Sequence, residues 1–264
     1  MHNLGIQGTA LAWFKSYLSE RTQCVDINGN RSAPKKINIS VMQGSILGPL
    51  LFLCFINDLP NATKILKLLL FADDTCALDS DVNINILIGR CNMELQQLAN
   101  WFVVNKISVN AAKCKYIIFH RQKKKLPTNL PNLEMNFNLI GNPVDPNLIT
   151  ILDRIDSGGH NPDLRYYKYL GILIDDSLSL SFHIDTICKK LNRALFCLNR
   201  VKHILNTKTL TTLYYSLFHS HLLYCSIILN CATPTLLKKY LFYKKKVYVR
   251  LQNHHSMLTQ HPSF

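Results

Sequence analysis

The stretch KLLLFADDTCALD, residues 67–79, places two adjacent aspartates behind a run of apolar residues. Residues Lys64 to Ala72 have the pattern of a buried strand, and Thr75 to Leu78 that of its hairpin partner. The tip of this hairpin would carry Asp73 and Asp74. Two like charges side by side repel, and a bound divalent cation with oxygen ligands removes that repulsion. An ordinary Asp-rich turn between two strands is the alternative explanation.

Around this hairpin, the periodicity of apolar residues predicts mixed strands and helices, followed by a helical C-terminal part. That order indicates an α+β fold with a helical appendage. Helices are predicted over residues 9–18, 48–58, 84–105, 182–205 and 210–229, with Thr9 as the N-cap of the first. Strands are predicted over residues 23–27, 37–41, 107–110, 115–120 and 166–176.

The composition points to a globular protein with a polyanionic partner. Of the 264 residues, 48% are hydrophobic and 17% are charged. The formal charge of +14 favours nucleic acid, with an anionic membrane surface as the alternative. The nine cysteines are odd in number and include no CxxC pair, so we expect free thiols and no disulfide-linked partner.

No membrane or export signal is evident in the sequence. The longest apolar run, Ile46 to Ile56, is shorter than the roughly 20 residues that a membrane-spanning helix needs. No signal peptide opens the sequence. We therefore expect an intracellular protein without a membrane partner, located in the nucleus or the cytoplasm.

The chain carries seven motifs in order, at residues 5–25, 43–60, 71–75, 105–119, 167–175, 183–205 and 213–230. In this order they resemble the motifs of the reverse transcriptases of non-LTR (LINE-like, Jockey-type) retrotransposons. FADDT, residues 71–75, looks like the catalytic hairpin of that family. Other stretches resemble its palm, its primer-gripping strand and the helices that follow. They are GIQGTALAWFKSYLSERTQCV (5–25), QGSILGPLLFLCFINDLP (43–60), NKISVNAAKCKYIIF (105–119), YKYLGILID (167–175), HIDTICKKLNRALFCLNRVKHIL (183–205) and LYYSLFHSHLLYCSIILN (213–230). Each piece alone is a weak signal, but together they are highly specific.

This resemblance implies a fold, a domain order and a reaction. The fold would be α+β: a polymerase palm, which is an antiparallel sheet with packed helices, then a helical thumb-like region, with the fingers missing. Residues 1–120 would form a partial palm, 121–164 a partly disordered loop or insertion, 165–180 the primer-grip strand region, and 181–264 the helical thumb-like and basic C-terminal region. The parent enzyme would extend a DNA primer on an RNA template with dNTPs, by two-metal nucleotidyl transfer using Mg²⁺ or Mn²⁺.

The resemblance also implies the catalytic residues. Asp73 and Asp74 would bind the metal, Asp73 most directly. Lys113 would sit near the leaving pyrophosphate, as an acid or a charge partner. A solvated surface lysine explains Lys113 equally well.

A second set of residues would contact the template and the incoming nucleotide. Gln43, Gly44 and Ser45 would lie along the nascent base pair, where the glycine allows a close approach of the backbone. A simple loop before a helix is the alternative. Met42 stands where the family usually has proline, which removes a rigid turn.

A third set would hold the primer. Tyr169, Leu170 and Gly171 would grip its end, unless they form only a core strand with a glycine bulge. The basic and aromatic segment 238–250 would contact phosphates and stack on bases, or else form a solvated basic helix.

The sequence departs from the family pattern at its start. The family's first catalytic motif supplies another metal-binding aspartate upstream of the segment at residues 5–25, and no acidic residue of this sequence precedes Glu20. We therefore expect a truncated enzyme whose polymerase activity is impaired or lost. A non-catalytic, basic nucleic-acid-binding remnant is the alternative function.

Overall fold

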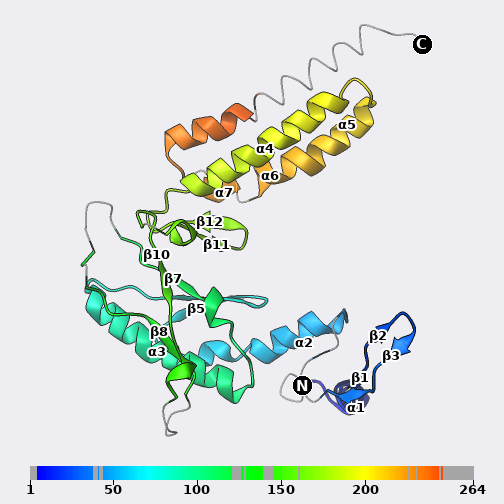
Figure 1. The fold of residues 1–264 in the computed structure, drawn as a ribbon, viewed down its shortest axis with the longest axis vertical. Helices are drawn as coiled ribbons and strands as arrows, with labels where there is room; N and C mark the ends of the chain where they lie inside the picture. Colours follow the sequence, from blue (N-terminus) through cyan, green and yellow to red (C-terminus); the bar gives the residue numbers. More distant parts are fainter. Residues whose placement is uncertain are drawn as a thin grey trace. The chain divides into compact units, whose positions relative to one another are not determined.

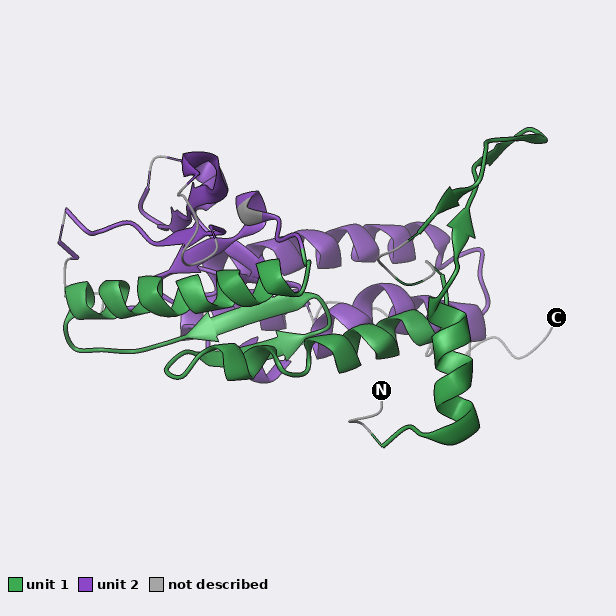
Figure 2. Cartoon of the chain, turned by 90° about the horizontal axis from the view of Figure 1, so that it is seen from below, with its two compact units in different colours: residues 1–107 green, residues 108–264 purple. Residues whose placement is uncertain are grey.

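The computed structural model divides into two compact units, which are coloured separately in Figure 2. Unit 1 comprises residues 1–107 and unit 2 residues 108–264. No helix in the described part of the chain is long and apolar enough to cross a membrane. The structure describes residues 5–37, 41, 44–120, 126–127, 129–138, 145–159, 161–224, 226–229, 231–243 and 245.

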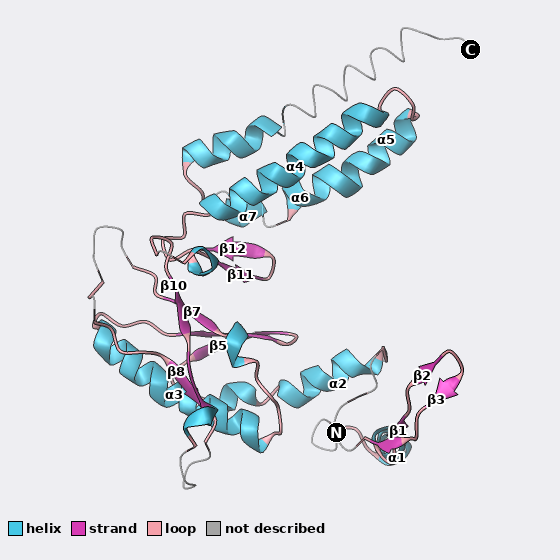
Figure 3. Cartoon of the chain, viewed as in Figure 1, coloured by secondary structure: helices cyan, strands magenta, loops and turns pink. Residues whose placement is uncertain are grey.

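Unit 1 combines three helices with short antiparallel strand pairs (Figures 1 and 3). β1 pairs with β4, β2 with β3, and β5 with β6, which confirms a mixed helix and strand fold. The elements are α1 (Gly8–Leu18), β1 (Thr22–Gln23), β2 (Asp26–Ile27), β3 (Asn30–Arg31), β4 (Lys35–Lys36), α2 (Leu47–Ile56), the 3-10 helix η2 (Leu59–Ala62), β5 (Lys67–Phe71), β6 (Asp74–Leu78) and α3 (Ile84–Val104).

Two local predictions for the first 41 residues need correction. Helix α1 starts one residue before Thr9, its N-cap is Gln7, and no side chain caps it. The hairpin around Asn28 and Gly29 is present, but its returning strands are β3 and β4, which end at Lys36. The returning strand thus lies earlier than predicted, and residues 38–40 lie outside the described residues.

The β5–β6 hairpin packs on the helices of unit 1 through one face. Leu68 and Leu70 point inward, because alternate residues of a strand face opposite sides. They contact a core formed by α2, η2 and α3, with Ile56, Leu59, Leu66 and Leu98 at its centre. The outer face of β5 is exposed, with Leu69 at 44% and Phe71 at 62% exposure. The prediction of a buried strand over Lys64 to Ala72 is therefore wrong for one face: apolar residues cover both faces of β5 (Lys67–Phe71), but within the described residues only the inner face is packed.

Unit 2 contains short strands followed by a helical part (Figure 3). Its elements are the 3-10 helix η3 (Ala111–Lys113), β7 (Lys115–Ile117), β8 (Glu134–Asn136), the 3-10 helix η4 (Pro146–Leu148), β9 (Ile149–Ile151), β10 (Asp153–Ile155), the 3-10 helix η5 (Pro162–Leu164), β11 (Tyr167–Tyr169), β12 (Ile172–Ile174), α4 (Ser181–Val201), α5 (Thr207–Tyr214), the π-helical turn η6 (Tyr215–His219), α6 (Ser220–Leu223) and α7 (Ser226–Leu229). Residues 234–243 are also helical.

Several elements of unit 2 differ from the prediction. Residues 107–110 form no strand. The segment 121–164 contains β8, β9 and β10 in its described parts, and β10 pairs in parallel with β7. The predicted strand at 166–176 is a hairpin, because the chain reverses between β11 and β12. The predicted helix at 210–229 is divided into α5, η6, α6 and α7.

The core of unit 2 forms around α4. This helix buries one face against the later helices, with Ile184 and Leu191 fully buried beside Phe218 of η6. Burying a leucine or isoleucine side chain contributes about 1.5–3 kcal/mol relative to exposure, so this face accounts for much of the stability of the bundle. Ile172 of β12 joins the same cluster and fastens the β11–β12 hairpin to the helices.

His183 is a buried histidine at this junction. Its Nδ1 accepts a hydrogen bond from the Leu173 N–H at 3.4 Å, and its buried Nε2 has no hydrogen-bond partner among the described residues. Burial, with a smaller contribution from Lys190, holds the pKa of His183 below its ordinary value. A proton on Nδ1 would point at the Leu173 N–H and repel it, so this position favours the neutral imidazole of His183.

We expect unit 2 to lose stability as pH falls below the ordinary histidine pKa of 6.5. The unfolded chain then takes up a proton that folded His183 resists, and the unfolded state is favoured. Urea midpoints at about pH 7.5 and about pH 5.5 measure the effect. H183N keeps an acceptor and should flatten the pH dependence, whereas H203N, at an exposed histidine, should not. An equal pH dependence in H183N and the unmodified chain would contradict the prediction.

Candidate active site

The tip of the β5–β6 hairpin is a two-residue turn. Phe71 pairs with Asp74, so only Ala72 and Asp73 reverse the chain. Ala72 has a positive φ of 51°, a conformation that costs a residue with a Cβ about 1–2 kcal/mol. Strain of this kind persists only where the surrounding structure enforces it, and it is frequent at functional sites.

Both aspartates at this tip are exposed. Neither carboxylate has a hydrogen bond or ion pair with the described residues, although the chain carries 30 Lys and Arg. The pair therefore keeps its oxygen atoms open to an outside partner. Among the described residues, no group of three or more His, Cys, Asp and Glu side chains that could hold a metal ion is present, at this tip or elsewhere.

A cavity of about 460 Å³ adjoins the tip and joins two of the predicted residue sets. Gly44 and Ser45 line it together with Asp73, so residues almost thirty positions apart come to one place. Its polar part is small and its walls are mainly apolar, as in most small-molecule sites. The remaining lining residues are Val41, Ile46, Gly48, Pro49, Phe52 and Ala72.

The loop before α2 positions Gly44 and Ser45. Gly44 has a φ of 82°, which favours glycine, and a Cβ at this position would meet no atom within 4 Å. Ser45 Oγ accepts the Leu47 N–H at 3.2 Å, at the start of α2, and shares a hydrogen bond of 2.6 Å with the Tyr17 hydroxyl. The serine therefore orders the loop as well as lining the cavity, and Gln43 lies outside the described residues.

Tyr169, Leu170 and Gly171 lie at the turn of the β11–β12 hairpin in unit 2. Leu170 and Gly171 both have positive φ, at 45° and 82°, as in the tightest two-residue hairpin turns. The Tyr224 hydroxyl donates to the Leu170 carbonyl, and its ring lies 3.3 Å from where a Gly171 Cβ would be. The predicted primer-grip turn is thus braced from the helical part of the same unit.

The sequence did not indicate that Tyr224 contacts this turn. It also did not indicate which residue contacts Lys113. Nothing in the sequence connects Tyr224 with a turn 54 residues earlier. Lys113 is exposed, and its carbonyl accepts a hydrogen bond from the Tyr167 hydroxyl at 3.4 Å. Lys113 belongs to unit 2 and the aspartate pair to unit 1, so its role near the pyrophosphate stays a prediction.

Unit 2 has a second cavity, of about 300 Å³, which includes none of the predicted site residues. Arg154 and Asp156 line it and bond to each other at 2.6 Å. Asp176 also lines it and accepts a hydrogen bond from the Ser157 hydroxyl. Because these charged groups already have partners within the protein, the cavity beside Asp73 is the better candidate.

Comparisons with known proteins found a matching family model and several relatives. Residues 1–174 match the family model described as reverse transcriptase (RNA-dependent DNA polymerase). The chain is 29% identical over 180 residues to the RNA-directed DNA polymerase from mobile element jockey of Drosophila melanogaster, covering 66% of this chain and 17% of that protein. It is 28% identical over 180 residues to the jockey protein of Drosophila funebris, covering 66% and 17%.

A third relative matches a longer segment. The chain is 28% identical over 206 residues to the probable RNA-directed DNA polymerase from transposon BS of Drosophila melanogaster, covering 75% of this chain and 20% of that protein. The chain therefore spans no more than a fifth of these relatives' length. No solved structure matches it significantly.

The bond from Tyr224 predicts a measurable contribution to unit 2. Y224F removes only the hydroxyl, so we expect the free energy of unfolding to fall by about 0.5–1.5 kcal/mol. Amide exchange at Leu170 and Gly171 should also accelerate, because the turn loses its brace. Y215F makes the same change at another exposed tyrosine of this unit and is the control. Equal effects of the two variants would show that the Tyr224 hydroxyl has no special role.

Proposed function

The chain belongs to the reverse transcriptase (RNA-dependent DNA polymerase) family, and from this premise we propose that it forms part of the polymerase region of a retrotransposon enzyme. In this proposal residues 1–120 act as a partial palm, residues 165–180 as the primer-grip strand region, and residues 181–264 as a thumb-like region. The substrates are an RNA template, a DNA primer and dNTPs. The observation that carries the proposal is the pair of open carboxylates beside a cavity lined by Gly44 and Ser45.

Asp73 and Asp74 are the residues that would hold Mg²⁺ or Mn²⁺. Their fit rests on the donor set: Mg²⁺ binds through one or two carboxylates and completes its coordination with water and substrate phosphates. When bound, such an ion supplies activation of the attacking oxygen and stabilisation of the charge on the leaving oxygen. The protein's own contribution is a rigid hairpin that holds both carboxylates at a strained turn.

The other predicted residues would orient the substrates. Gly44 gives the nucleotide access to the backbone, and Ser45 keeps this loop in place through its bonds to Leu47 and Tyr17. Phe52 and Pro49 supply an apolar wall on which a base or sugar can rest. Gln43 would complete this set.

The primer end and the pyrophosphate would be contacted from unit 2. Tyr169, Leu170 and Gly171 hold the primer end in this proposal, on a turn that Tyr224 braces. Lys113 balances the charge of the pyrophosphate. These roles are the ones that the resemblance of the sequence motifs to this family implies.

The activity of the whole relatives is a proposal for a longer polypeptide, since this chain covers 17% of the jockey proteins. Within the 264 residues no acidic side chain precedes Glu20, so that segment supplies no further carboxylate to the metal. We expect the 264 residues on their own to bind metal and nucleic acid more readily than they extend a primer.

Helix α4 offers a surface for the nucleic-acid backbone. Its solvent side carries Lys189, Arg193 and Arg200 at spacings of four and seven, which place them along one stripe. The Arg200 guanidinium lies 5.0 Å from the centre of the exposed Phe196 ring on the same stripe. Cations interleaved with an aromatic ring suit phosphates and stacked bases.

We expect Mn²⁺ to bind the folded chain, detected by the loss of the free Mn²⁺ signal in electron paramagnetic resonance. D73N or D74N should weaken this binding by about tenfold or more, because each removes one of two charged ligands. D58N is the control, since Asp58 is an exposed aspartate without a side-chain partner among the described residues. A D58N effect equal to that of D73N would refute the assignment of the hairpin tip.

A double variant, K189Q/R193Q, tests the α4 stripe. We expect it to weaken binding to an RNA–DNA primer–template and to reduce the slope of log affinity against log salt by about one to two. K35Q/K36Q removes the same charge from strand β4 of unit 1 and should change the slope less if the stripe is the contact. Identical slopes for K189Q/R193Q and the unmodified chain would exclude the stripe from the interface.

A further inference from the structure

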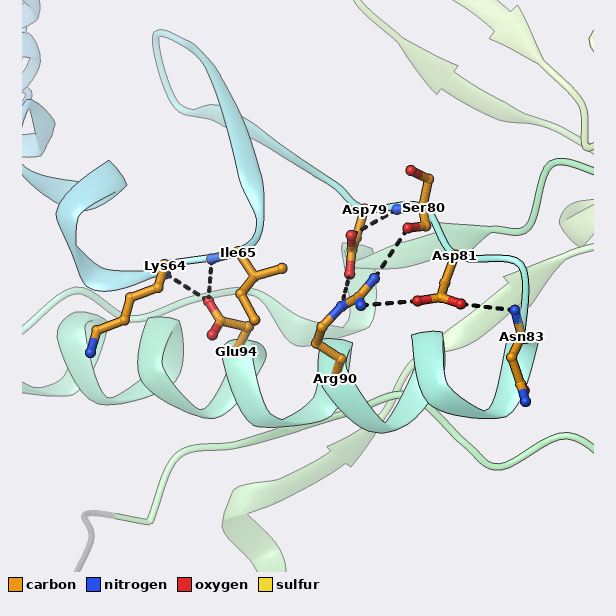
Figure 4. Close-up of polar contacts among 8 residues, drawn as sticks. All are labelled: Lys64, Ile65, Asp79, Ser80, Asp81, Asn83, Arg90 and Glu94. Carbon is orange, nitrogen blue, oxygen red and sulfur yellow. Dashed lines mark hydrogen bonds and ion pairs between the residues drawn. The ribbon is translucent and has the colours of Figure 1, made fainter.

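Helix α3 forms hydrogen bonds with the chain where it leaves the β5–β6 hairpin (Figure 4). Arg90 of α3 donates from Nε to Asp79 at 2.7 Å and from Nη1 to Asp81 at 3.0 Å. Its Nη2 donates to the Ser80 carbonyl at 3.1 Å. The Asn83 amide, with the help of Arg90, lowers the pKa of Asp81, so the carboxylate stays charged in this arrangement.

Helix α3 also forms hydrogen bonds with the chain where it enters the hairpin. One carboxylate oxygen of Glu94 accepts the N–H groups of Lys64 at 2.8 Å and of Ile65 at 3.2 Å (Figure 4). These two amides precede β5 and take part in no strand pairing. Glu94 therefore satisfies backbone donors and fixes the direction in which the strand begins.

Arg90 and Glu94 are four residues apart, so they lie on one side of α3. Arg90 contacts the segment after β6 and Glu94 the segment before β5, so the open end of the hairpin is held on both strands. The carboxylates Asp73 and Asp74 lie at the opposite end. We infer that Arg90 and Glu94 are positioning residues, which set the placement of the two carboxylates; this rests on the proposed function.

The length of the hairpin explains why its base controls its tip. Five paired residues extend about 17 Å. A tilt of about 10° at the base would then move the tip by about 3 Å, and a displacement of about 1 Å already reduces catalysis by about a hundredfold in some enzymes. Small changes at Arg90 or Glu94 are thus amplified at the carboxylates.

Apolar packing alone does not fix this angle. Leu68 and Leu70 attract the hairpin to the helices, but such contacts have no preferred direction. Within the described residues β5 and β6 form a two-stranded sheet, and no third strand restrains either edge. Among the described residues, the hydrogen bonds that join its base to α3 in a fixed direction are those of Arg90 and Glu94.

The test uses the full chain with R90A, E94A, E94Q and the control R31A. Arg31 pairs with Asp26 at 2.9 Å in the same unit, away from the hairpin. Two quantities are measured under conditions in which every variant is folded by circular dichroism: Mn²⁺ affinity, and amide exchange at Phe71 and Asp74. A residue that only adds global stability does not change the affinity of the folded protein for metal.

We expect R90A and E94A to weaken Mn²⁺ binding by roughly three- to tenfold and to accelerate exchange at Phe71 and Asp74. R31A should do neither. E94Q should largely restore both quantities, because its amide oxygen still accepts the two backbone N–H groups.

Unchanged affinity and exchange in R90A and E94A would overturn the inference, and failure of E94Q to improve on E94A would overturn it for Glu94. If the unmodified chain binds no Mn²⁺, the proposed function fails by itself. Amide exchange at Phe71 and Asp74 in R90A and E94A then still shows whether the contacts at the base of the hairpin order its tip.

Discussion

Pairing of Phe71 with Asp74 leaves two residues to reverse the chain, and this places a carboxylate inside the turn and another at the first position of β6. The turn requires a positive φ at Ala72, which its own local energy does not favour. The conformation is therefore imposed by the strands, whose inner leucines are packed on α2, η2 and α3. The candidate site depends on that packing, because a loosely held turn would relax and separate the carboxylates.

The cavity beside Asp73 depends on the same packing of the hairpin on the helices of unit 1. Gly44 and Ser45 reach Asp73 only because α2 packs beside the hairpin in the core of unit 1. Ser45 joins the loop to both α2 and Tyr17, so the wall of the cavity opposite the aspartate is ordered by hydrogen bonds. In the proposed function, the turn and the hydrogen-bonded loop that line this cavity would supply the preorganisation that a metal-dependent transfer reaction requires.

Local patterns in the sequence were sufficient for the β5–β6 hairpin, for α3 and for α4. Each has a strong period, and Asn83 caps α3 through Asn85 and Ile86. Contacts between distant segments leave no such pattern. Arg90 meets Asp79 eleven residues away, and Tyr224 meets Leu170 across 54 residues.

The errors of prediction also arise from contacts between distant segments, which the sequence does not reveal. A continuous apolar run predicts burial on both sides of β5, yet only one side has a packing partner. The parallel pairing of β7 with β10 joins segments almost forty residues apart, with Lys115 and Asp153 forming an ion pair across it. The sequence predicts the first of these strands within residues 115–120, but it assigns β10 to the loop over residues 121–164, because β10 has only three residues.

The use of acidic residues in a basic chain supports the assignment of the hairpin tip. The chain has only 16 acidic side chains but 30 cationic ones, so each carboxylate has many possible cationic partners. Most carboxylates in the described residues take part in ion pairs or hydrogen bonds: Glu20, Asp26, Asp79, Asp81, Glu94, Asp145, Asp153, Asp156, Asp175, Asp176 and Asp185.

Asp73 and Asp74 are different, because two neighbouring carboxylates have no partner among the described residues and lie at a strained turn beside a cavity. Asp58 and Asp163 also have no side-chain partner in the described part of the chain, but neither has an acidic neighbour in the sequence. Adjacent uncompensated charges reduce stability unless something binds them. Arg90 forms ion pairs with Asp79 and Asp81 at the opposite end of the hairpin, and no cation of the described residues pairs with the tip. Leaving the tip open makes physical sense if its cation comes from solution.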